Sequence, residues 1–510
     1  MTTFMALAPL LAVVSGALVV LLAEAFMKRA NREPLGYLAA ITLLTAGFFT
    51  VRSWNQDLSF FGGRLLLDRF ALLLFAAFIV IGLVVVLMSL EYAARQGLNL
   101  GELCGLVLLA VAGLMIMVSS TDWLIVFLGL EVLSVASYAL SGLKKTDRAS
   151  SEAAAKYFLM GSFAGAFFVF GLALLFGTSG SLDFSTLLAD GASGVGLAPA
   201  GAVGLGLILA ALGFKIAIAP FHMWAPDVYE GAPTPVTVFL TVGPKAAGLA
   251  VLFRLLVPLL RNEPFTAVFG PALTLMAVLT MFAGNLAALR QRSVKRMLAY
   301  SSIAHSGYLL VAVIAGDGPS LVFYLVVYLF MNAGAFSVLA AMSRKGVKGR
   351  AFGSPLARVL YPQASTAEVD PRVKPGAPAA VEYTALDDFA GLGRRYPWLA
   401  ACLSVFLLSL AGFPPTAGFL AKFYVFSGAV REGHVALAVA AVLASLVSVA
   451  YYLKVIVVMY MKDETGEVVI EAENPALYLV IFLCLFGVVQ LGLWPGNLLA
   501  LIRQALSVVF

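Results

Sequence analysis

The chain has 510 residues, of which 62% are apolar and only 12% are charged. Soluble domains carry about 25% charged residues, so this composition excludes a soluble globular protein and indicates a polytopic membrane protein. The net charge of +6 lies mostly in short loops between apolar segments, which is typical of membrane topology and argues against nucleic-acid binding. The three cysteines lie singly in separate apolar segments, so we expect neither a metal site nor an iron–sulfur cluster in this chain.

Apolar runs long enough to cross a hydrocarbon core of about 30 Å recur along nearly the whole chain. They predict an all-α membrane protein with about fourteen transmembrane helices. The approximate ranges are 4–27, 35–52, 70–90, 103–120, 122–142, 153–177, 203–219, 236–260, 265–289, 294–315, 319–343, 399–428, 435–461 and 475–506.

Lysine and arginine gather in alternate loops, which predicts the orientation of the chain in the membrane. No positive charge precedes the first apolar run and Lys28 and Arg29 follow it, so we expect a retained first helix with its N-terminus outside. An even number of spans then places both termini outside. The loop 344–398 is expected in the cytoplasm. It is rich in proline, alanine and charge, and we interpret it as a flexible connector with a short helix near Leu386–Leu392.

Two of the predicted spans are interrupted by prolines. The seventh contains GFKIAIAPFHMWAPDVYEGAPTP, and the twelfth contains LSLAGFPPTAGFLAKFYVF. A helix broken within the membrane is tolerated only where protein or water satisfies the freed backbone groups, and paired breaks point to inverted repeats around a transport path. We therefore expect spans four to eight to repeat as spans nine to thirteen. The expected divisions are 1–102 for helices 1–3, 103–262 for the first repeat, 263–462 for the second repeat and 463–510 for the last helix.

Four ionisable residues lie deep within predicted spans: Glu131, Lys215, Lys245 and Lys422. A charged side chain at the centre of a bilayer costs at least about 2.5 kcal/mol, so such residues are functional candidates by default. Glu131 is expected to pair with Lys215. Burial favours the neutral form of a lysine and a nearby carboxylate favours the charged form, so a lysine held between the two can exchange protons.

Three further residues are candidates for the same path. His222 follows the first break, and His305 lies in the polar run LAYSSIAHSGYLL; each imidazole can accept a proton on one nitrogen and donate from the other. A hydrogen-bonded core histidine is the alternative for both. Lys156 lies about one turn from the cytoplasmic end of its span, where its side chain can also extend to the interface.

The string FKIAIAPFHMWAPDVYEGAPTPVTVFLTVGPKAAG resembles the antiporter-like membrane subunits of respiratory complex I, and YEGAPTPV and TVGPK are closest to the subunit N branch. RSVKRMLAYSSIAHSGYLL and AGFPPTAGFLAKFYVF match the same family, and the resemblance extends over essentially the whole chain. It implies a fold of fourteen helices with two inverted five-helix repeats and broken helices 7 and 12.

The resemblance also implies roles for the matched residues. Glu131 and Lys215 would form a modulated ion pair, Lys245 the central lysine and Lys422 the distal lysine of a proton path, with His222 and His305 bridging. The chain would hold no cofactor. FMN, iron–sulfur clusters and quinone would belong to partner subunits, namely a peripheral redox arm, and other membrane subunits would lie beside this chain in the lipid bilayer. The extended loop 344–398 departs from the family pattern, so no family role is carried onto it.

Two alternatives remain open from the sequence. One is a subunit of a multi-subunit cation/proton antiporter, which shares the fold and the lysines but needs no electron donor. The other is a structural scaffold whose buried charges only fix helix packing.

Overall fold

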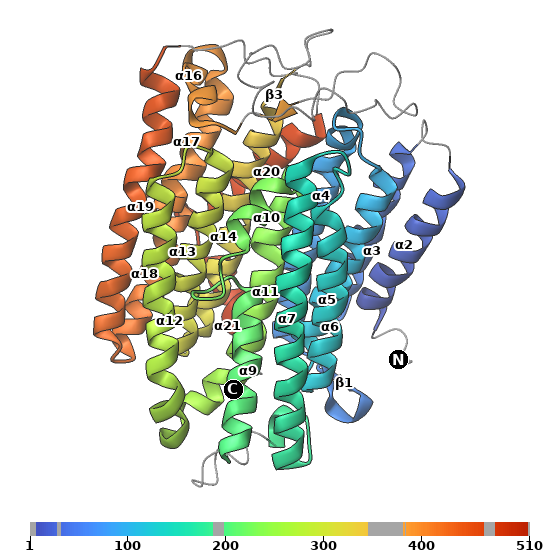
Figure 1. Cartoon of the computed structure of the whole chain (residues 1–510), viewed down its shortest axis with the longest axis vertical. Coiled ribbons are helices and arrows are strands. Elements are labelled where there is room, and N and C mark those ends of the chain that lie inside the picture. Colours follow the sequence, from blue (N-terminus) through green and yellow to red (C-terminus); the bar gives the residue numbers. More distant parts are fainter. Residues whose placement is uncertain are drawn as a thin grey trace.

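The computed structural model describes residues 7–27, 32–186, 198–344, 381–382, 384–463 and 475–507. Lys28, Arg29 and most of the loop 344–398 lie outside these ranges. The described residues form a bundle of helices that run side by side along the longest axis of the molecule (Figure 1).

Three spans open the bundle: α2 (Ala8–Phe26), α3 (Glu33–Arg52) and α4 (Arg69–Arg95). Between α3 and α4, the antiparallel strands β1 (Leu58–Phe60) and β2 (Leu65–Leu67) flank the short helix η2 (Phe61–Gly63). The next five spans are α5 (Leu100–Ser119), α6 (Trp123–Ser141), α7 (Arg148–Ser179), the broken pair α9 (Pro199–Lys215) and α10 (Ala225–Gly231), and α11 (Thr234–Leu260).

The following five spans are α12 (Glu263–Leu289), α13 (Val294–Ile314), α14 (Gly318–Ala341), the broken pair α17 (Pro397–Ala411) and α18 (Ala417–Arg431), and α19 (Val435–Met461). Two-residue strands β3 (Ser343–Arg344) and β4 (Val381–Glu382), then η4 (Leu386–Phe389) and α16 (Leu392–Arg395), lie between α14 and α17. The chain closes with α20 (Pro475–Leu493) and α21 (Gly496–Leu506).

The number of spans agrees with the prediction. Within the described ranges, 12 helices are long and apolar enough to cross a membrane, and the two broken pairs supply the remaining crossings. The breaks fall in the seventh and twelfth spans, five spans apart, which is the arrangement that the expected repeats require. The short helix expected near Leu386–Leu392 corresponds to η4 and α16.

The predicted last span, 475–506, is wrong in one respect. It consists of two helices, α20 and α21, separated at Trp494 and Pro495. A proline has no backbone N–H and cannot continue the hydrogen bonding of the preceding helix, so the chain turns there.

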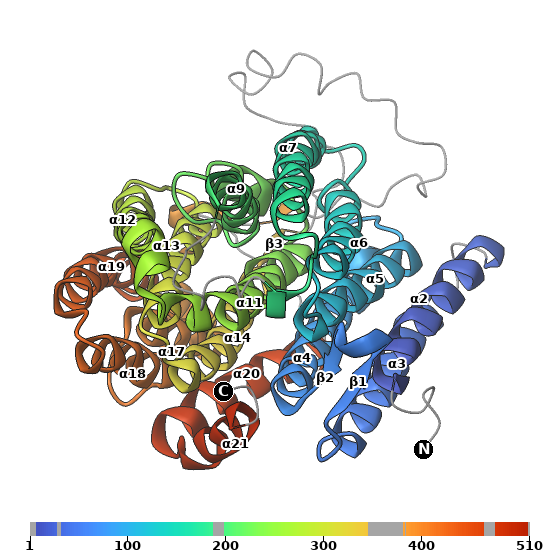
Figure 2. The same cartoon turned by 90° about the horizontal axis from the view of Figure 1, so that it is seen from below.

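The middle of the bundle is formed by α11, α13 and α14. Their apolar windows are 100%, 94% and 89% buried, whereas that of α2 is 22% buried. Seen along the bundle, α11 and α14 lie centrally, α2 and α3 lie at one edge, and α18 and α19 lie at the opposite edge (Figure 2). The central helices therefore have almost no access to lipid, and polar side chains on them must find partners within the protein.

Candidate functional site

The first break places Lys215 at the end of α9. The chain leaves the helix through Ala217, which has a φ of 56°, and the freed backbone groups find side-chain partners on neighbouring helices. Ala219 N–H donates to Thr280 Oγ1 at 2.8 Å, and the Ile216 carbonyl accepts from Ser306 at 2.7 Å. A broken helix within a membrane needs such partners, so the break is built into the structure.

The second break is formed in a similar way around Gly412, which ends α17 with a φ of 87°. This left-handed conformation favours glycine. The Lys422 ammonium donates to the freed Ala411 carbonyl at 2.9 Å, and Gly418 N–H donates to Ser409 Oγ at 3.1 Å. Lys422 thus lies directly against the break in its own span.

Lys215 is 2% exposed and lies between α6 and α7. Its ammonium donates to Ser134 Oγ at 2.9 Å and to the Tyr157 hydroxyl at 3.2 Å. Ser134 is three residues after Glu131 on α6. Lys215 therefore contacts α6 about one turn away from Glu131, its expected partner. No ion pair within 4 Å joins Lys215 to Glu131. The Glu131 carboxylate is half-buried and lies against Gly165 of α7.

Lys245 lies on α11 at the centre of the bundle and is 1% exposed. Its ammonium donates to both the carbonyl and the hydroxyl oxygen of Ser302 on α13, and lies 6.0 Å from the centroid of the Tyr229 ring. Ser306 donates to the Ser302 carbonyl at 3.2 Å as well as to Ile216. The neighbourhood of Lys215 is thereby joined to that of Lys245 through backbone and serine oxygens.

His305 continues this polar region along α13. Its Nδ1 lies 2.7 Å from the Tyr324 hydroxyl and its Nε2 lies 3.4 Å from the Tyr452 hydroxyl. The Tyr452 hydroxyl is also hydrogen-bonded to Ser301. Both ring nitrogens therefore have hydroxyl partners, an arrangement in which an imidazole can accept a proton on one side and donate on the other.

Lys422 forms the far end of the region. Its ammonium donates to Ser445 on α19 at 2.9 Å and lies 5.2 Å from the Tyr308 ring centroid. The Tyr308 hydroxyl accepts from Asn285 at 2.9 Å, and Asn285 accepts from Tyr451 at 3.0 Å. We name the set of buried polar side chains from α6 to α19 the polar row: Ser134, Lys215, Lys245, Ser302, His305, Ser306, Tyr308, Tyr324, Lys422 and Tyr452.

Two candidates lie apart from the polar row. His222 is half-buried after the first break, and its Nδ1 has no hydrogen-bond partner among the described residues. Lys156 forms ion pairs with Asp227 at 2.6 Å and Glu152 at 2.7 Å. It therefore ties α7 to α10, and its side chain is directed to carboxylates instead of extending freely to an interface.

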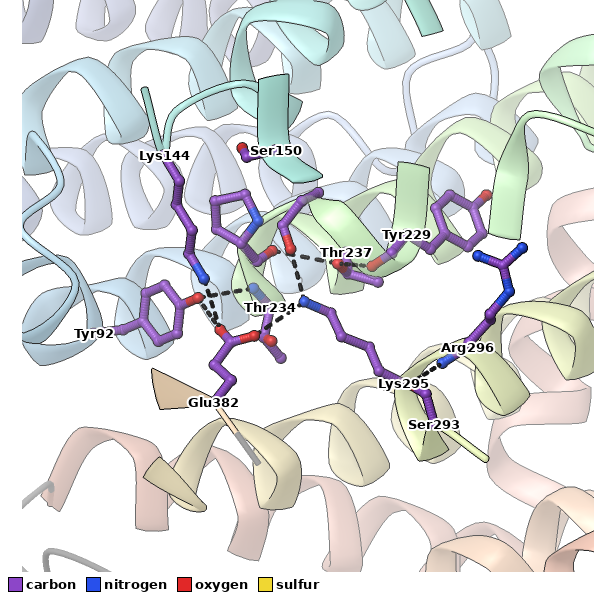
Figure 3. A network of polar contacts seen from close by, with 12 residues as sticks. Tyr92, Lys144, Ser150, Tyr229, Thr234, Thr237, Ser293, Lys295, Arg296 and Glu382 are labelled. Atoms are coloured by element: carbon purple, nitrogen blue, oxygen red, sulfur yellow. Dashed lines mark hydrogen bonds and ion pairs between the residues drawn. The ribbon is translucent and has the colours of Figure 1, made fainter. Parts of the chain in front are cut away.

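The sequence did not indicate two buried ion-pair sites. Arg254 on α11 binds both carboxylate oxygens of Asp68, at 2.8 and 3.0 Å. Glu382, in the loop interpreted as a connector without chemistry, lies among Lys144, Lys295 and Tyr92 (Figure 3). The interpretation of the loop 344–398 as a flexible connector is therefore corrected for its last part, which contains Glu382. Within the described ranges, no group of three or more His, Cys, Asp or Glu side chains could hold a metal ion.

The broken helices and the row of buried lysines define an antiporter-like membrane protein. The chain belongs to the family described as NADH:quinone oxidoreductase/Mrp antiporter, TM, which matches residues 120–355 and 377–448. Subunit N of NADH-quinone oxidoreductase from Trichlorobacter lovleyi is 39% identical over 497 residues, 96% of this chain and 94% of that protein. Subunit N from Chloroflexus aggregans is 41% identical over 517 residues, 99% and 97% of the two chains. The resemblance noted in the sequence is confirmed.

Solved structures agree with this assignment. A chain of respiratory complex I from Thermus thermophilus with bound aureothin matches with a TM-score of 0.77 and 30% identity, over 96% of this chain and 98% of that chain. The Mrp complex from Dietzia matches with a TM-score of 0.78 at 20% identity, over 99% and 97% of the two chains. At that identity the second match shows the common fold alone.

Proposed function

We propose that this chain is an antiporter-like membrane subunit, of the subunit N type, in an NADH-quinone oxidoreductase, and that it moves protons along the polar row. The observation that carries the proposal is the position of Lys215, Lys245 and Lys422. Each is at least 95% buried and each donates to neutral oxygens. The subunit N relatives from Trichlorobacter lovleyi and Chloroflexus aggregans, 39% and 41% identical over nearly the whole chain, support the proposal.

The proposed mechanism rests on changes of charge next to buried lysines. A change in the charge of a nearby group alters the proton affinity of a lysine. Movement or neutralisation of Glu131 would act on Lys215 across one turn of α6. A proton would then pass between Lys245 and Lys422 through Ser302, His305 and the neighbouring tyrosine hydroxyls, whose hydrogen bonds support such a relay.

The assembly around the chain is part of the proposal. Partner subunits would hold FMN, the iron–sulfur clusters and quinone, and their redox chemistry would drive the lysines of this chain. Other membrane subunits would pack beside it in a bacterial inner membrane, with the loop 344–398 in the cytoplasm and both termini in the periplasm. A cation/proton antiporter without redox partners would share this fold, and co-purification of flavin- and iron–sulfur-containing subunits distinguishes the two.

Replacement of Lys245 by alanine in the intact complex tests the proposal. We expect K245A to lower the initial rate of NADH-driven proton pumping into inverted membrane vesicles by roughly 100-fold, the usual contribution of a positioned proton-transfer group. Quinone reduction, which is coupled to pumping, should fall with it, while the complex remains assembled.

The matched control is K454A. Lys454 also lies in a transmembrane helix, α19, but its side chain is exposed and outside the polar row. This variant should pump at the wild-type rate. Wild-type pumping by an assembled K245A complex would refute the proposed function and favour a scaffold.

A further inference from the structure

Glu382 lies at the end of the bundle that carries the loop 344–398, and its side chain is 12% exposed. Its carboxylate forms ion pairs with Lys144 at 3.3 Å and Lys295 at 3.2 Å, and accepts a hydrogen bond from the Tyr92 hydroxyl (Figure 3). These partners come from α4, from the loop after α6 and from α13. One carboxylate from the loop thus joins three separate parts of the bundle.

The segment around Glu382 is held by backbone hydrogen bonds. Ser343 of β3 lies opposite Glu382 of β4 in antiparallel pairing. Val294 N–H donates to the Thr384 carbonyl and Leu386 N–H donates to the Arg292 carbonyl, both at 2.7 Å. The backbone of this segment is therefore bonded to the end of α14 at Glu382 and to the start of α13 at Thr384 and Leu386.

The partners of Glu382 bind the connection between α10 and α11. Lys295 donates to the Ala232 carbonyl at 2.7 Å, and Thr234 N–H donates to the Tyr92 hydroxyl at 3.1 Å. Ala232 caps α10 and Thr234 opens α11. Loss of the negative charge would therefore leave the groups that hold this connection without their common partner.

A polar face of α11 leads from this connection to Lys245. Thr234, Thr237, Thr241 and Lys245 follow one another at intervals of three, four and four residues, which places them on one face of the helix. All four side chains are 0–2% exposed. Thr237 donates to the carbonyl of Tyr229, whose ring faces Lys245. In a helix that is otherwise almost wholly apolar, this face places polar side chains at successive turns between the bundle end and the central lysine.

On its other side, Glu382 borders a small cavity of about 10 Å³, which has room for about one water molecule. Tyr92, Arg95 and Gln96 also line it. The carboxylate thus lies between a hydratable cavity and the polar face of α11.

The charges at this point are unequal, with two ammonium groups for one carboxylate. Burial raises the pKa of Glu382, but the charges of Lys295 and Lys144 and the hydrogen bonds from Tyr92 and Lys295 outweigh burial and bring the pKa to about 2. The carboxylate therefore stays ionised at neutral pH and acts as a fixed counter-charge.

We propose that Glu382 is a positioning residue for proton uptake, which offsets one of the two positive charges of Lys144 and Lys295 and so holds the connection between α10 and α11 at the start of the polar face that leads to Lys245. This inference rests on the proposed function of Lys245. It assigns a role to the part of the loop that is inserted between α14 and α17.

The test uses E382Q in the intact complex, because glutamine keeps the shape of the side chain and removes its charge. Loss of a hydrogen-bonded buried charge costs one to two factors of ten in an equilibrium, so we expect about a tenfold lower pumping rate in inverted vesicles. K144Q/E382Q restores the net charge of the site and should recover most of that rate. D387N, which alters an exposed carboxylate in η4 of the same segment, should leave the rate unchanged.

Recovery by the second substitution is the decisive readout, because a loss that came only from the altered side chain at Glu382 would not be repaired by removing the charge of Lys144. Wild-type pumping by E382Q, or no recovery in K144Q/E382Q, would overturn the inference. If E382Q fails to assemble, the test uses E382D, which keeps the charge, and K144Q/E382Q. Pumping by both variants supports the inference, and loss of pumping in K144Q/E382Q overturns it. K245A is measured in parallel: normal pumping by K245A refutes the proposed function, whereas loss in K245A with normal pumping in E382Q refutes only the role of Glu382.

Discussion

At the scale of single residues, the buried cations fall into two groups according to their partners. Lys215, Lys245 and Lys422 donate to hydroxyl and carbonyl oxygens. Arg254 and Lys295 contact carboxylates. Direct pairing with a carboxylate stabilises the charged form of a cation strongly. A hydroxyl group can accept from an ammonium or donate to an amine, and a neutral carbonyl oxygen favours the charged form less than a carboxylate does. The first group is suited to proton exchange and the second to fixing the structure.

Glu382 allows a prediction of how the stability of the folded chain depends on pH. Its pKa in the folded chain, about 2, lies below its ordinary value of 4.5. The ionised carboxylate therefore stabilises the folded chain above about pH 4.5, and this stabilisation is lost as the pH falls toward 2. We expect the difference in aggregation temperature between wild type and E382Q to be constant from about pH 8 to about pH 5 and to shrink at lower pH.

The measurement is the aggregation temperature of the detergent-solubilised protein, followed by immunoblotting of an epitope tag. D387N serves as the control, because the Asp387 carboxylate is exposed and pairs with Lys462 at 3.5 Å. A difference for E382Q that widens on acidification would contradict the assigned charge state.

At the scale of elements, close contact between helices depends on glycines at the crossings. At Gly284 of α12, an added Cβ would lie 2.6 Å from Ala304 N and 2.8 Å from the Tyr300 carbonyl oxygen of α13. These are backbone atoms, so neither can move aside as a flexible side chain would. The close approach fixes α13, which carries Ser302 and His305, against α12.

We therefore expect G284A to destabilise the chain by about 1–3 kcal/mol, the usual cost of overpacking, and to lower pumping because α13 shifts. Thermal aggregation and vesicle pumping measure the two effects. G206A on α9 is the matched control, because no atom lies within 4 Å of its added Cβ. Both variants gain the same helix propensity, so their difference isolates the contact between α12 and α13. Equal stability of the two variants would contradict this packing argument.

At the scale of the whole molecule, an even number of spans places the start of the first helix and the end of the last helix at the same end of the bundle. The start of α2 and the end of α21 lie toward the end of the bundle opposite α16 and β3 (Figure 1). Lys144 pairs with Glu382 of β4, and the Arg292 carbonyl accepts from Leu386 of η4, so these basic residues lie at the end that carries β3 and β4. By the positive-inside rule, we expect that end to face the cytoplasm.

Reporter fusions test this topology. Alkaline phosphatase, which is active only after export, should be active when fused after Phe510 and inactive when fused after Gln291, between α12 and α13. A cytoplasmic fluorescent reporter at the same two positions should give the opposite pattern. Phosphatase activity at both positions, or at Gln291 alone, would overturn the proposed orientation.

The sequence by itself determined the membrane class, the number of spans, the two breaks and the buried lysines. These depend on run length, composition and proline, which act over about twenty residues or fewer. It did not reveal that the last span divides at Pro495, since the apolar run continues across that proline.

Only the tertiary structure decided which partners the buried charges have. Asp68 and Arg254 are 186 residues apart in the chain, and Tyr92 and Glu382 are 290 apart. No local pattern marks such contacts, because they depend on how distant helices pack. For the same reason, the separation of Lys215 from Glu131 by one turn of α6, and the burial of a carboxylate from a charged loop, came from the packed bundle alone.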